Sequence, residues 1–495
     1  MIMSAEQAIL KGQIEFEQLA DVVRQASEQG ERIDRVEGVV FQGLLRMGLA
    51  LMKGFVAGQG TGDLGETFEH EGRTLCRLEQ LHQRRYVSIF GELTVSRHVY
   101  GTRETQKLEV VPLDARIGLP RDDYSNLLKQ WDQSFCVCNS YEESRSSMEQ
   151  ILGLKQSVQA LEHQNQQMAQ SVEGFRQQQA APPKREEGSI LVFTADGKGV
   201  PMRRQADEPA PQGRLKPGEK ANKKRMAVVG AVNTIDPFVR TADDIVDEVM
   251  REKASERRPK PRHKRVRAEL TREIGGQEAN GKDVVFGWFK QQHEQRNADS
   301  SRKAVCLMDG ERALWSAQKT YFAGIAIVCV LDLFHMLERL WQAAHCFFPE
   351  NSDQAKSFVT ERLKRALEGN VGRVIGGLRQ MGTKRQLKGA KLKQLQTALT
   401  YLENNRQYMH YDQYLAAGCP IASGVAEGAC RHLVKDRMEL TGMRWCMDSA
   451  QAMLDVRAMY LGDDWMEFNE YRISEETRRL YPYQDAVEQS WRDAA

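Results

Sequence analysis

The sequence predicts an α/β core built on a mixed five-stranded sheet, with a helical insertion and a mostly helical region before it. Short apolar runs bounded by glycine recur after residue 188, and each is typical of a buried strand. Apolar residues at helical spacing dominate residues 1–56 and 124–170. A segment rich in Gln and Pro, residues 164–187, lies between the two patterns and predicts a domain boundary.

The composition is that of an ordinary soluble globular protein. The chain has 495 residues, of which 41% are hydrophobic and 28% charged, enough for two to four domains. It has no unbroken run of about 18 apolar residues and no basic leader before an apolar stretch, so we expect a cytoplasmic protein. The nine cysteines are scattered, and only Cys136 and Cys138 lie close together, without a second pair at zinc-ribbon spacing.

The net charge of +2 is small, but basic residues are concentrated in two stretches. These are Arg203–Arg225 and Arg251–Arg267, and they would bind phosphates without sequence preference and with strong salt dependence. The alternative is that both stretches are solvated loops. The first stretch contributes Lys223, Lys224 and Arg225 to the expected DNA-binding residues.

The first 180 residues divide into three predicted segments. Residues 1–60 are helical, and their apolar stripe would either dimerise or pack internally. Residues 61–120 form a hairpin and loop segment, with two strands in Arg84–Tyr100 joined near Gly91. Residues 121–180 return to helix.

The third segment has the outline of a helix–turn–helix. One helix ends near Leu152, Gly153 turns the chain, and a second helix begins near Lys155. Lys155 and Gln156 would then contact phosphates and base edges in a groove of DNA. A plain helical hairpin explains the pattern equally well.

The predicted core occupies residues 188–345, and its elements can be taken in order. The first three strands form an antiparallel meander, and a strand–helix–strand–helix unit follows a charged, mostly helical stretch. The expected strands are Ser189–Ala195, Met226–Ile235, Pro237–Arg240, Lys303–Gly310 and Ala326–Asp332. The helical insertion spans residues 346–415, which is too long for a simple connection, and residues 416–495 supply the last helices and the tail.

This order of elements is that of a ribonuclease H-like domain, in which acids from the first strand, the fourth strand and a late helix converge. Asp196, Asp309 and Glu427 occupy those places. Three carboxylates supply the oxygen ligands that two Mg²⁺ ions require, and Mn²⁺ could substitute. Glu427 lies among small residues, whereas its competitor Glu439 lies among basic ones and is better explained as a surface ion pair.

Each acid also has a simpler explanation. Asp196 and Asp309 both precede glycine, a common turn pattern, and Asp309 would also cap the helix that starts at Glu311. Asp332 is either an accessory ligand or the cap of the helix that carries His335, and His335 is either near the metals or a satisfied core histidine.

Four segments carry a resemblance to a known family: TADGKGVPM, LMDGERALW, VLDLFHMLERLW and GVAEGACRHLVKDRMELTGMRW. In this order they resemble the ISKra4 family of bacterial insertion-sequence transposases, of the DDE type. The resemblance matches the family's acids to Asp196, Asp309 and Glu427, and the Asp-x-x-His pattern of the related Mutator-like transposases to Asp332 and His335. Tyr100–Pro112 lacks the cysteines that many relatives carry there, which argues against an N-terminal zinc module.

The resemblance implies DNA cleavage and strand transfer at the ends of a mobile element, in a bacterial cytoplasm and on the nucleoid when DNA is bound. The partners would be the terminal inverted repeats, the target DNA and at least one further copy of the chain. Residues near Glu427 would contact that DNA: Arg431, Lys435, Arg444 and Trp445, of which Trp445 would stack on a base or else belong to the core. Two other functions fit the same fold, a catalytically inactive DNA-binding protein and a structure-selective nuclease.

Overall fold

The computed structural model describes residues 4–102, 110–204, 224–250, 258–422, 424–462 and 464–494, which divide into two compact units. The first unit comprises Met1–Phe175 and Met466–Ala495, and the second comprises Arg176–Trp465. The division falls inside the predicted boundary segment. The sequence assigned the C-terminal helices to the tail of the α/β core, whereas most of residues 466–494 pack in the first unit.

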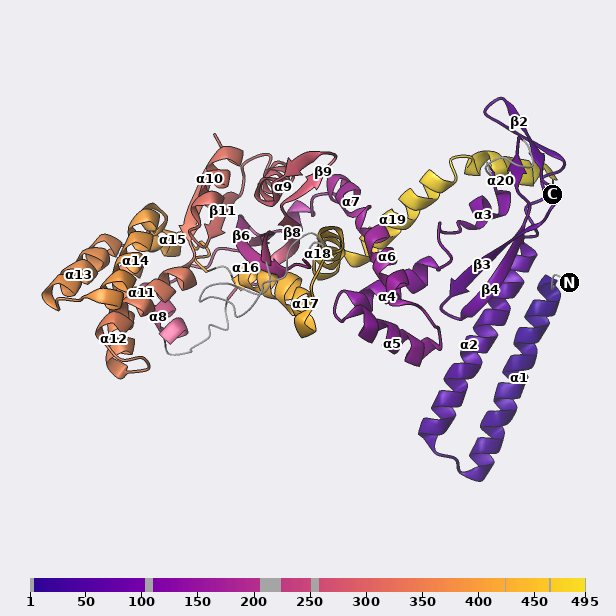
Figure 1. The fold of residues 1–495 in the computed structure, drawn as a ribbon, viewed down its shortest axis with the longest axis horizontal. Coiled ribbons are helices and arrows are strands. Elements are labelled where there is room, and N and C mark those ends of the chain that lie inside the picture. Colours follow the sequence, from indigo (N-terminus) through magenta and orange to yellow (C-terminus); the bar gives the residue numbers. More distant parts are fainter. Residues whose placement is uncertain are drawn as a thin grey trace. The chain divides into compact units, whose positions relative to one another are not determined.

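The first unit is mostly helical and contains small antiparallel sheets (Figure 1). Its two long N-terminal helices are joined by a short turn, and the predicted hairpin is present with its turn before Gly91. An additional hairpin precedes it. The elements are α1 (Ala5–Gln29), α2 (Ile33–Gly58), β1 (Thr67–His70), β2 (Arg73–Arg77), β3 (His82–Ser88), β4 (Gly91–Arg97), β5 (Tyr100–Gly101), α3 (Pro112–Ile117), α19 (Trp465–Leu480) and α20 (Gln484–Ala494).

Three consecutive helices, α4 (Asn126–Cys136), α5 (Tyr141–Leu152) and α6 (Val158–Ala169), pack against one another in this unit. Ser140 and Glu143 form a capping box that starts α5, and Gly153 ends it with a left-handed φ of 69°. Ser157 caps α6, so this helix begins three residues later than the sequence predicted. The geometry is that of two helices joined by a short glycine turn, with α4 as a third partner.

One helix in the described parts of the chain, α2, is long and apolar enough to cross a membrane by length and composition alone. The sequence of α2 contains no unbroken apolar run of that length, because charged residues such as Arg46 and Lys53 interrupt it.

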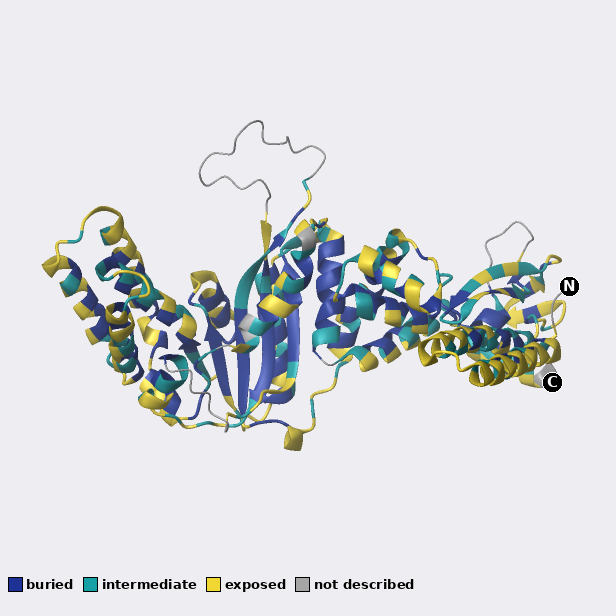
Figure 2. Cartoon of the chain, turned by 90° about the horizontal axis from the view of Figure 1, so that it is seen from below, coloured by how far each residue is buried: buried dark blue, intermediate teal, exposed yellow. Residues whose placement is uncertain are grey.

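The second unit is built on a five-stranded mixed sheet (Figure 1). The strand order is β12-β11-β6-β7-β8, in which β6, β11 and β12 are parallel and β7 and β8 are antiparallel to their neighbours. The strands are largely buried (Figure 2). Their bounds are β6 (Ile190–Pro201), β7 (Lys224–Ile235), β8 (Arg262–Leu270), β11 (Lys303–Met308) and β12 (Ile327–Leu331).

The third strand of the meander differs from the prediction. Pro237–Arg240 is not a strand, and the edge strand β8 instead lies inside the basic stretch. Arg265 and Arg267 of β8 are buried. Hydrogen bonds compensate for this burial: Arg265 donates to Gln292 at 3.0 Å, and Arg267 donates to Glu269 at 2.8 Å. These two side chains therefore hydrogen-bond inside the protein and do not contribute to a phosphate-binding surface.

Helices cover both faces of this sheet. Alternation along β6 places Phe193 against Phe289 of α9 (Gly281–Arg296), with ring centroids 5.3 Å apart, and turns Asp196 to the opposite face. On that opposite face the short helix α16 (Gly424–Ala429) and the π-helical turn η3 (Cys430–Lys435) pack against β6. Two further short helical turns follow, α17 (Asp436–Met438) and η4 (Leu440–Gly442), and then α18 (Met447–Leu461) packs against β8.

The insertion predicted for residues 346–415 is helical in the structure. It continues from α11 (Leu333–Phe347), which packs against its first and third helices. The remaining elements of the unit are α8 (Ala242–Met250), β9 (Arg272–Ile274), β10 (Gln277–Ala279), α10 (Arg312–Tyr321), α12 (Asp353–Leu367), α13 (Val371–Lys384), α14 (Gly389–Asn405) and α15 (Tyr411–Ala416).

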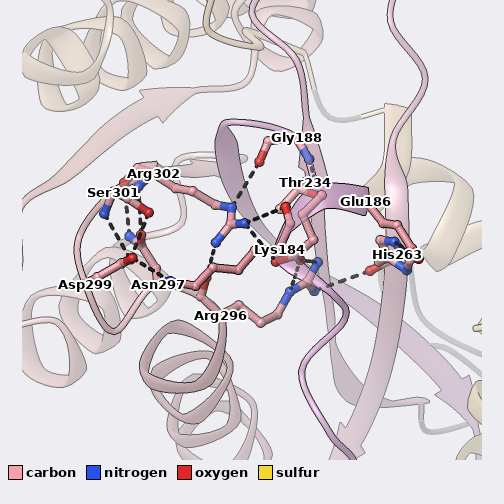
Figure 3. Close-up of polar contacts among 11 residues, drawn as sticks. Lys184, Glu186, Gly188, Thr234, His263, Arg296, Asn297, Asp299, Ser301 and Arg302 are labelled. Atoms are coloured by element: carbon pink, nitrogen blue, oxygen red, sulfur yellow. Dashed lines mark hydrogen bonds and ion pairs between the residues drawn. The ribbon is translucent and has the colours of Figure 1, made fainter.

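A polar cluster fixes the start of β6 (Figure 3). Arg302 donates to the carbonyl of Gly188 at 3.1 Å and to the carbonyl of Arg296 at 2.6 Å. Glu187, which is buried, accepts from Arg296 at 2.6 Å, and Gly188 donates to the hydroxyl of Thr234 at 3.0 Å. The strand that carries Asp196 is therefore anchored at its N-terminal end to α9, β7 and the segment before β11.

Candidate nucleic-acid processing site

Three aspartates follow one rung of the parallel part of the sheet. Met308 of β11 pairs with Ala195 of β6 on one side and with Leu331 of β12 on the other. The next residue along the chain after each of these is an aspartate: Asp196, which lies within β6, and Asp309 and Asp332, which directly follow β11 and β12. Because these strands run in the same direction, the three aspartates occupy the same edge of the sheet.

The carboxylates at this edge influence one another. Burial raises the pKa of Asp309, the backbone N–H of Glu311 lowers it, and the negative charges of Asp196 and Asp332 raise it. The pKa of Glu311 is raised by burial and by the charges of Asp309 and Asp196. Such mutual repulsion is the pattern of an acidic site that a cation would stabilise.

The structure shows what Asp332 and His335 contact, and Asp332 differs from Asp196 and Asp309 in its role. Asp332 is completely buried, and its Oδ1 accepts from the backbone N–H of Phe334 at 2.8 Å and of His335 at 3.4 Å. Asp332 thus has the capping role that the sequence left open for it. His335 is half-buried, and its charge lowers the pKa of Asp309.

A second element brings position 427 to the same strand. Glu427 belongs to α16, which packs against β6 and β7, and its side chain lies outside the part that the structure describes. Cys430, one turn later, donates its thiol to Oδ2 of Asp196 at 3.3 Å. Burial and the charge of Asp196 raise the pKa of Cys430, so the thiol keeps the proton that it donates. Glu439 instead forms an ion pair with Lys224, as expected of a surface acid.

Two residues support the backbone at Asp309, and only one of them, Gly310, has a local signal in the sequence. The hydroxyl of Tyr401, on α14 of the insertion, donates to the backbone carbonyl of Asp309. Gly310 has a φ of +92°, and a Cβ atom there would lie 2.8 Å from that hydroxyl. The DG dipeptide was a signal for the glycine, but nothing local connects Tyr401 to a strand 92 residues earlier.

A polar groove of about 470 Å³ opens beside Gly310. Its lining comes from the start of α10 and from one side of α14, and it contains two basic side chains and no acidic one. The lining residues are Gly310, Arg312, Lys393, Gln396, Thr397, Thr400, Tyr401, Asn404 and Asn405. The basic and amide side chains of this lining could donate hydrogen bonds to a phosphate group, and no acidic side chain in the lining would repel it.

The expected DNA-binding residues fall into two groups. Lys155, Arg225, Arg431, Lys435 and Arg444 are exposed, although Arg431 lies 3.8 Å from Asp436, and Lys224 is exposed but paired with Glu439. Lys223 lies outside the described residues, as do residues 205–222 and 251–257 of the two basic stretches.

Two of these residues are not placed as a DNA contact requires. Gln156 is buried and donates to Oδ1 of Asp132 at 2.9 Å. Trp445 is 5% exposed, its Nε1 donates to the carbonyl of Met438, and the guanidinium of Arg437 lies 4.9 Å from its ring centroid. The structure therefore assigns Trp445 to the core, which was one of the two roles that the sequence left open.

Among the residues whose side chains are described, no group of three or more His, Cys, Asp and Glu lies close enough to hold a metal ion. Neither the protein-family models nor the curated proteins contain a match to this chain.

Proposed function

We propose that this chain is a DNA transposase of the DDE type, similar to the ISKra4 family, with a ribonuclease H-like core. The observation that carries the proposal is that Asp196, within β6, and Asp309, directly after β11, follow paired residues of two adjacent parallel strands. The sheet supports it: β6, β7 and β8 form an antiparallel meander, and β11 and β12 complete the mixed five-stranded sheet that the sequence led us to expect.

The donor set fits divalent magnesium in its chemistry. Asp196 and Asp309 offer hard carboxylate oxygens, and the mutual repulsion of the acids leaves a negative charge to be neutralised. With Glu427 as the third acid, these residues would hold two Mg²⁺ ions, with Mn²⁺ as a substitute. Bound ions would stabilise charge on the attacking and leaving oxygens of an in-line displacement at phosphorus.

The chain's own residues would then hold and orient the DNA. Tyr401 and Gly310 fix the backbone at Asp309, and Cys430 fixes the orientation of Asp196. The polar groove beside Gly310 would receive one strand near the scissile phosphate. Arg431 and Lys435, exposed on the turn after Glu427, would bind phosphates nearby.

The reaction has two balanced steps. In the first, a water oxygen bonds to phosphorus at the element end and the P–O3′ bond breaks, which leaves a 3′-hydroxyl. In the second, that hydroxyl bonds to a phosphorus of the target DNA and a target 3′-oxygen leaves. The α4–α6 helices would recognise the terminal inverted repeats, at least two copies would act together, and the enzyme would work in the bacterial cytoplasm on the nucleoid.

The test uses the full chain, Mg²⁺ and DNA that carries the sequences flanking its gene. We expect nicking at the element ends and joining to a supercoiled target plasmid. Asp196→Asn and Asp309→Asn should bind this DNA but leave it uncut, whereas Asp353→Asn, at an exposed site in the first turn of α12, should cut normally.

Three results would contradict the proposal. Equal products from wild type and Asp196→Asn would remove the acids from the chemistry. Cleavage of branched DNA without any joining would favour a structure-selective nuclease. Tight binding with no cleavage by the wild type in Mg²⁺ or Mn²⁺ would favour an inactive DNA-binding protein.

A further inference from the structure

The two long helices of the first unit, α1 and α2, lie side by side (Figure 1). They contact each other through small residues. Ala8, Gly12, Gly43, Ala50 and Gly54 are buried along their contact. A Cβ atom at Gly43 would lie 2.7 Å from the side chain of Leu19, so a larger residue there would displace Leu19. Leu19 is buried at this contact, whereas many of the other large apolar side chains of the two helices are exposed.

Seven of those large side chains form what we call the apolar stripe. They are 38% to 85% exposed, and they recur at spacings of four, seven and eleven residues, which keep residues on one side of a helix. The stripe consists of Ile9, Phe16 and Val23 on α1 and Ile33, Leu44, Leu51 and Phe55 on α2.

Both halves of the stripe border the same side of the contact between the helices. Leu51 reaches α1, because a Cβ atom at Gly12 would lie 3.5 Å from its Cδ2. Ile9 likewise reaches α2, because a Cβ atom at Gly54 would lie 3.1 Å from its Cγ1. The other side of the contact is polar, since Arg46 of α2 forms an ion pair of 3.0 Å with Glu15 of α1. The apolar stripe therefore lies on one side of this contact and the ion pair on the other.

We propose that the apolar stripe docks against the same stripe of a second copy of this chain, so that two hairpins form a four-helix bundle. The area is suitable. Seven large side chains, each about half exposed and each offering on the order of 200 Å² when free, present roughly 700 Å². A stable interface needs about 800 Å² from each partner.

The pattern favours a second copy over other occupants. Heptad-like spacing suits a helical partner, whose side chains interdigitate with those of the stripe. A dimer with two-fold symmetry needs a surface that is complementary to itself, and a stripe of aliphatic and aromatic side chains satisfies this condition. The ion pair on the opposite face makes α2 unlike a helix surrounded by lipid, which is apolar on all sides. The inference does not depend on the proposed enzymatic activity.

The experiment measures the mass of the full-length protein in solution by light scattering and sedimentation at several concentrations. We expect the wild type to have twice its chain mass of 56.3 kDa. The double variant Phe16→Glu/Leu44→Glu places charges in the stripe, and its dimer dissociation constant should rise at least about 100-fold.

The matched control is Leu10→Glu/Val39→Glu, which changes two apolar side chains on the same helices that are equally exposed but lie outside the stripe. It should remain dimeric. Far-ultraviolet circular dichroism checks that both variants are folded. If the double variant Phe16→Glu/Leu44→Glu is unfolded, the single variant Ile33→Asp, at the most exposed stripe position, replaces it in the experiment.

Three outcomes would overturn the inference. A monomeric wild type at tens of micromolar would exclude the dimer. Equal weakening by the stripe and control variants would locate the interface elsewhere. A monomer that sediments with anionic phospholipid vesicles, and that the stripe variant releases, would assign the stripe to a membrane surface. Because none of these measurements includes DNA, their failure is distinct from failure of the transposase proposal.

Discussion

Asp132 is a buried carboxyl group whose replacement by asparagine should change how the stability of the first unit depends on pH. It lies on α4, is completely inaccessible to solvent, and its Oδ1 accepts from Nε2 of Gln156 at 2.9 Å. Its Oδ2 has no hydrogen-bond partner among the described residues. Burial raises the pKa of Asp132 from 3.8 to about 7, and the amides of Gln156 and Gln164 only partly oppose this shift.

The sign follows from proton binding. Between pH 4 and 7 the folded unit retains the proton on Asp132 while the unfolded chain has released it, so stability falls as the pH rises through this window. A shift of about three pKa units corresponds to about 4 kcal/mol in total, of which roughly 2–3 kcal/mol is lost between pH 5 and pH 8. Asp132→Asn is neutral throughout and keeps the acceptor for Gln156, so it lacks this loss.

The assay compares urea unfolding of the full-length wild type and variant at pH 5 and pH 8. Hydrogen exchange in peptides from α4 and α6 identifies the transition of this unit. The stability of the variant relative to the wild type should rise by roughly 2–3 kcal/mol from pH 5 to pH 8. Asp123→Asn, at a half-exposed aspartate nearby, is the control and should show a much smaller change. A relative stability that does not change with pH would show that folded Asp132 is already ionised at pH 5.

Two further predictions concern the acidic site. Gly310→Ala should reduce DNA cleavage at least tenfold, because its Cβ would displace Tyr401 from Asp309, whereas Gly324→Ala, also at positive φ but with no atom within 4 Å, should cleave normally. Glu427→Gln should abolish cleavage with DNA binding retained, whereas Glu439→Gln should lose only its ion pair with Lys224 and cleave at near wild-type rates. Equal cleavage by both members of either pair, measured in a nicking assay, would contradict the corresponding assignment.

The positions of Asp196 and Asp309 could be predicted because each acid follows a short apolar run, although β6 continues past Asp196 to Pro201. Burial of such a run is dictated by local sequence, and the acid marks its end. That the two strands are adjacent, parallel and in register follows from the order of elements in the fold. The mixed five-stranded sheet was therefore predicted, although one of its five strands was placed wrongly.

The third strand was misplaced because its sequence looks like surface. Arg265 of β8 finds its hydrogen-bond partner far along the chain, at Gln292 of α9. Glu269 lies two residues from Arg267 and is just as buried. A buried ion pair has no local signature, because its desolvation is offset by residues that the sequence does not place nearby.

The same limitation explains Gln156 and the C-terminal helices. Gln156 is polar and precedes a helix, as a DNA-contacting residue would, but Asp132 on another helix draws it into the interior. The helices α19 and α20 return to the first unit through contacts such as that of the Tyr483 hydroxyl, which accepts from the backbone N–H of Val111 at 3.1 Å. These are long-range contacts, which periodicity cannot reveal.

The hydrogen bond between Cys430 and Asp196 bears on whether Glu427 or Glu439 is the third acid of the proposed site. Cys430 places its thiol on Asp196, so the helix that carries it faces the strand with the first acid. Residues three apart share one side of a helix, which puts position 427 on the side that Cys430 turns toward β6. The π-helical turn η3 begins at Cys430, and such turns are frequent at functional sites. Glu439 lies beyond that turn, with Lys224 as its partner. This arrangement favours Glu427 over Glu439 as the third acid of the proposed site, and the comparison of Glu427→Gln with Glu439→Gln tests that assignment.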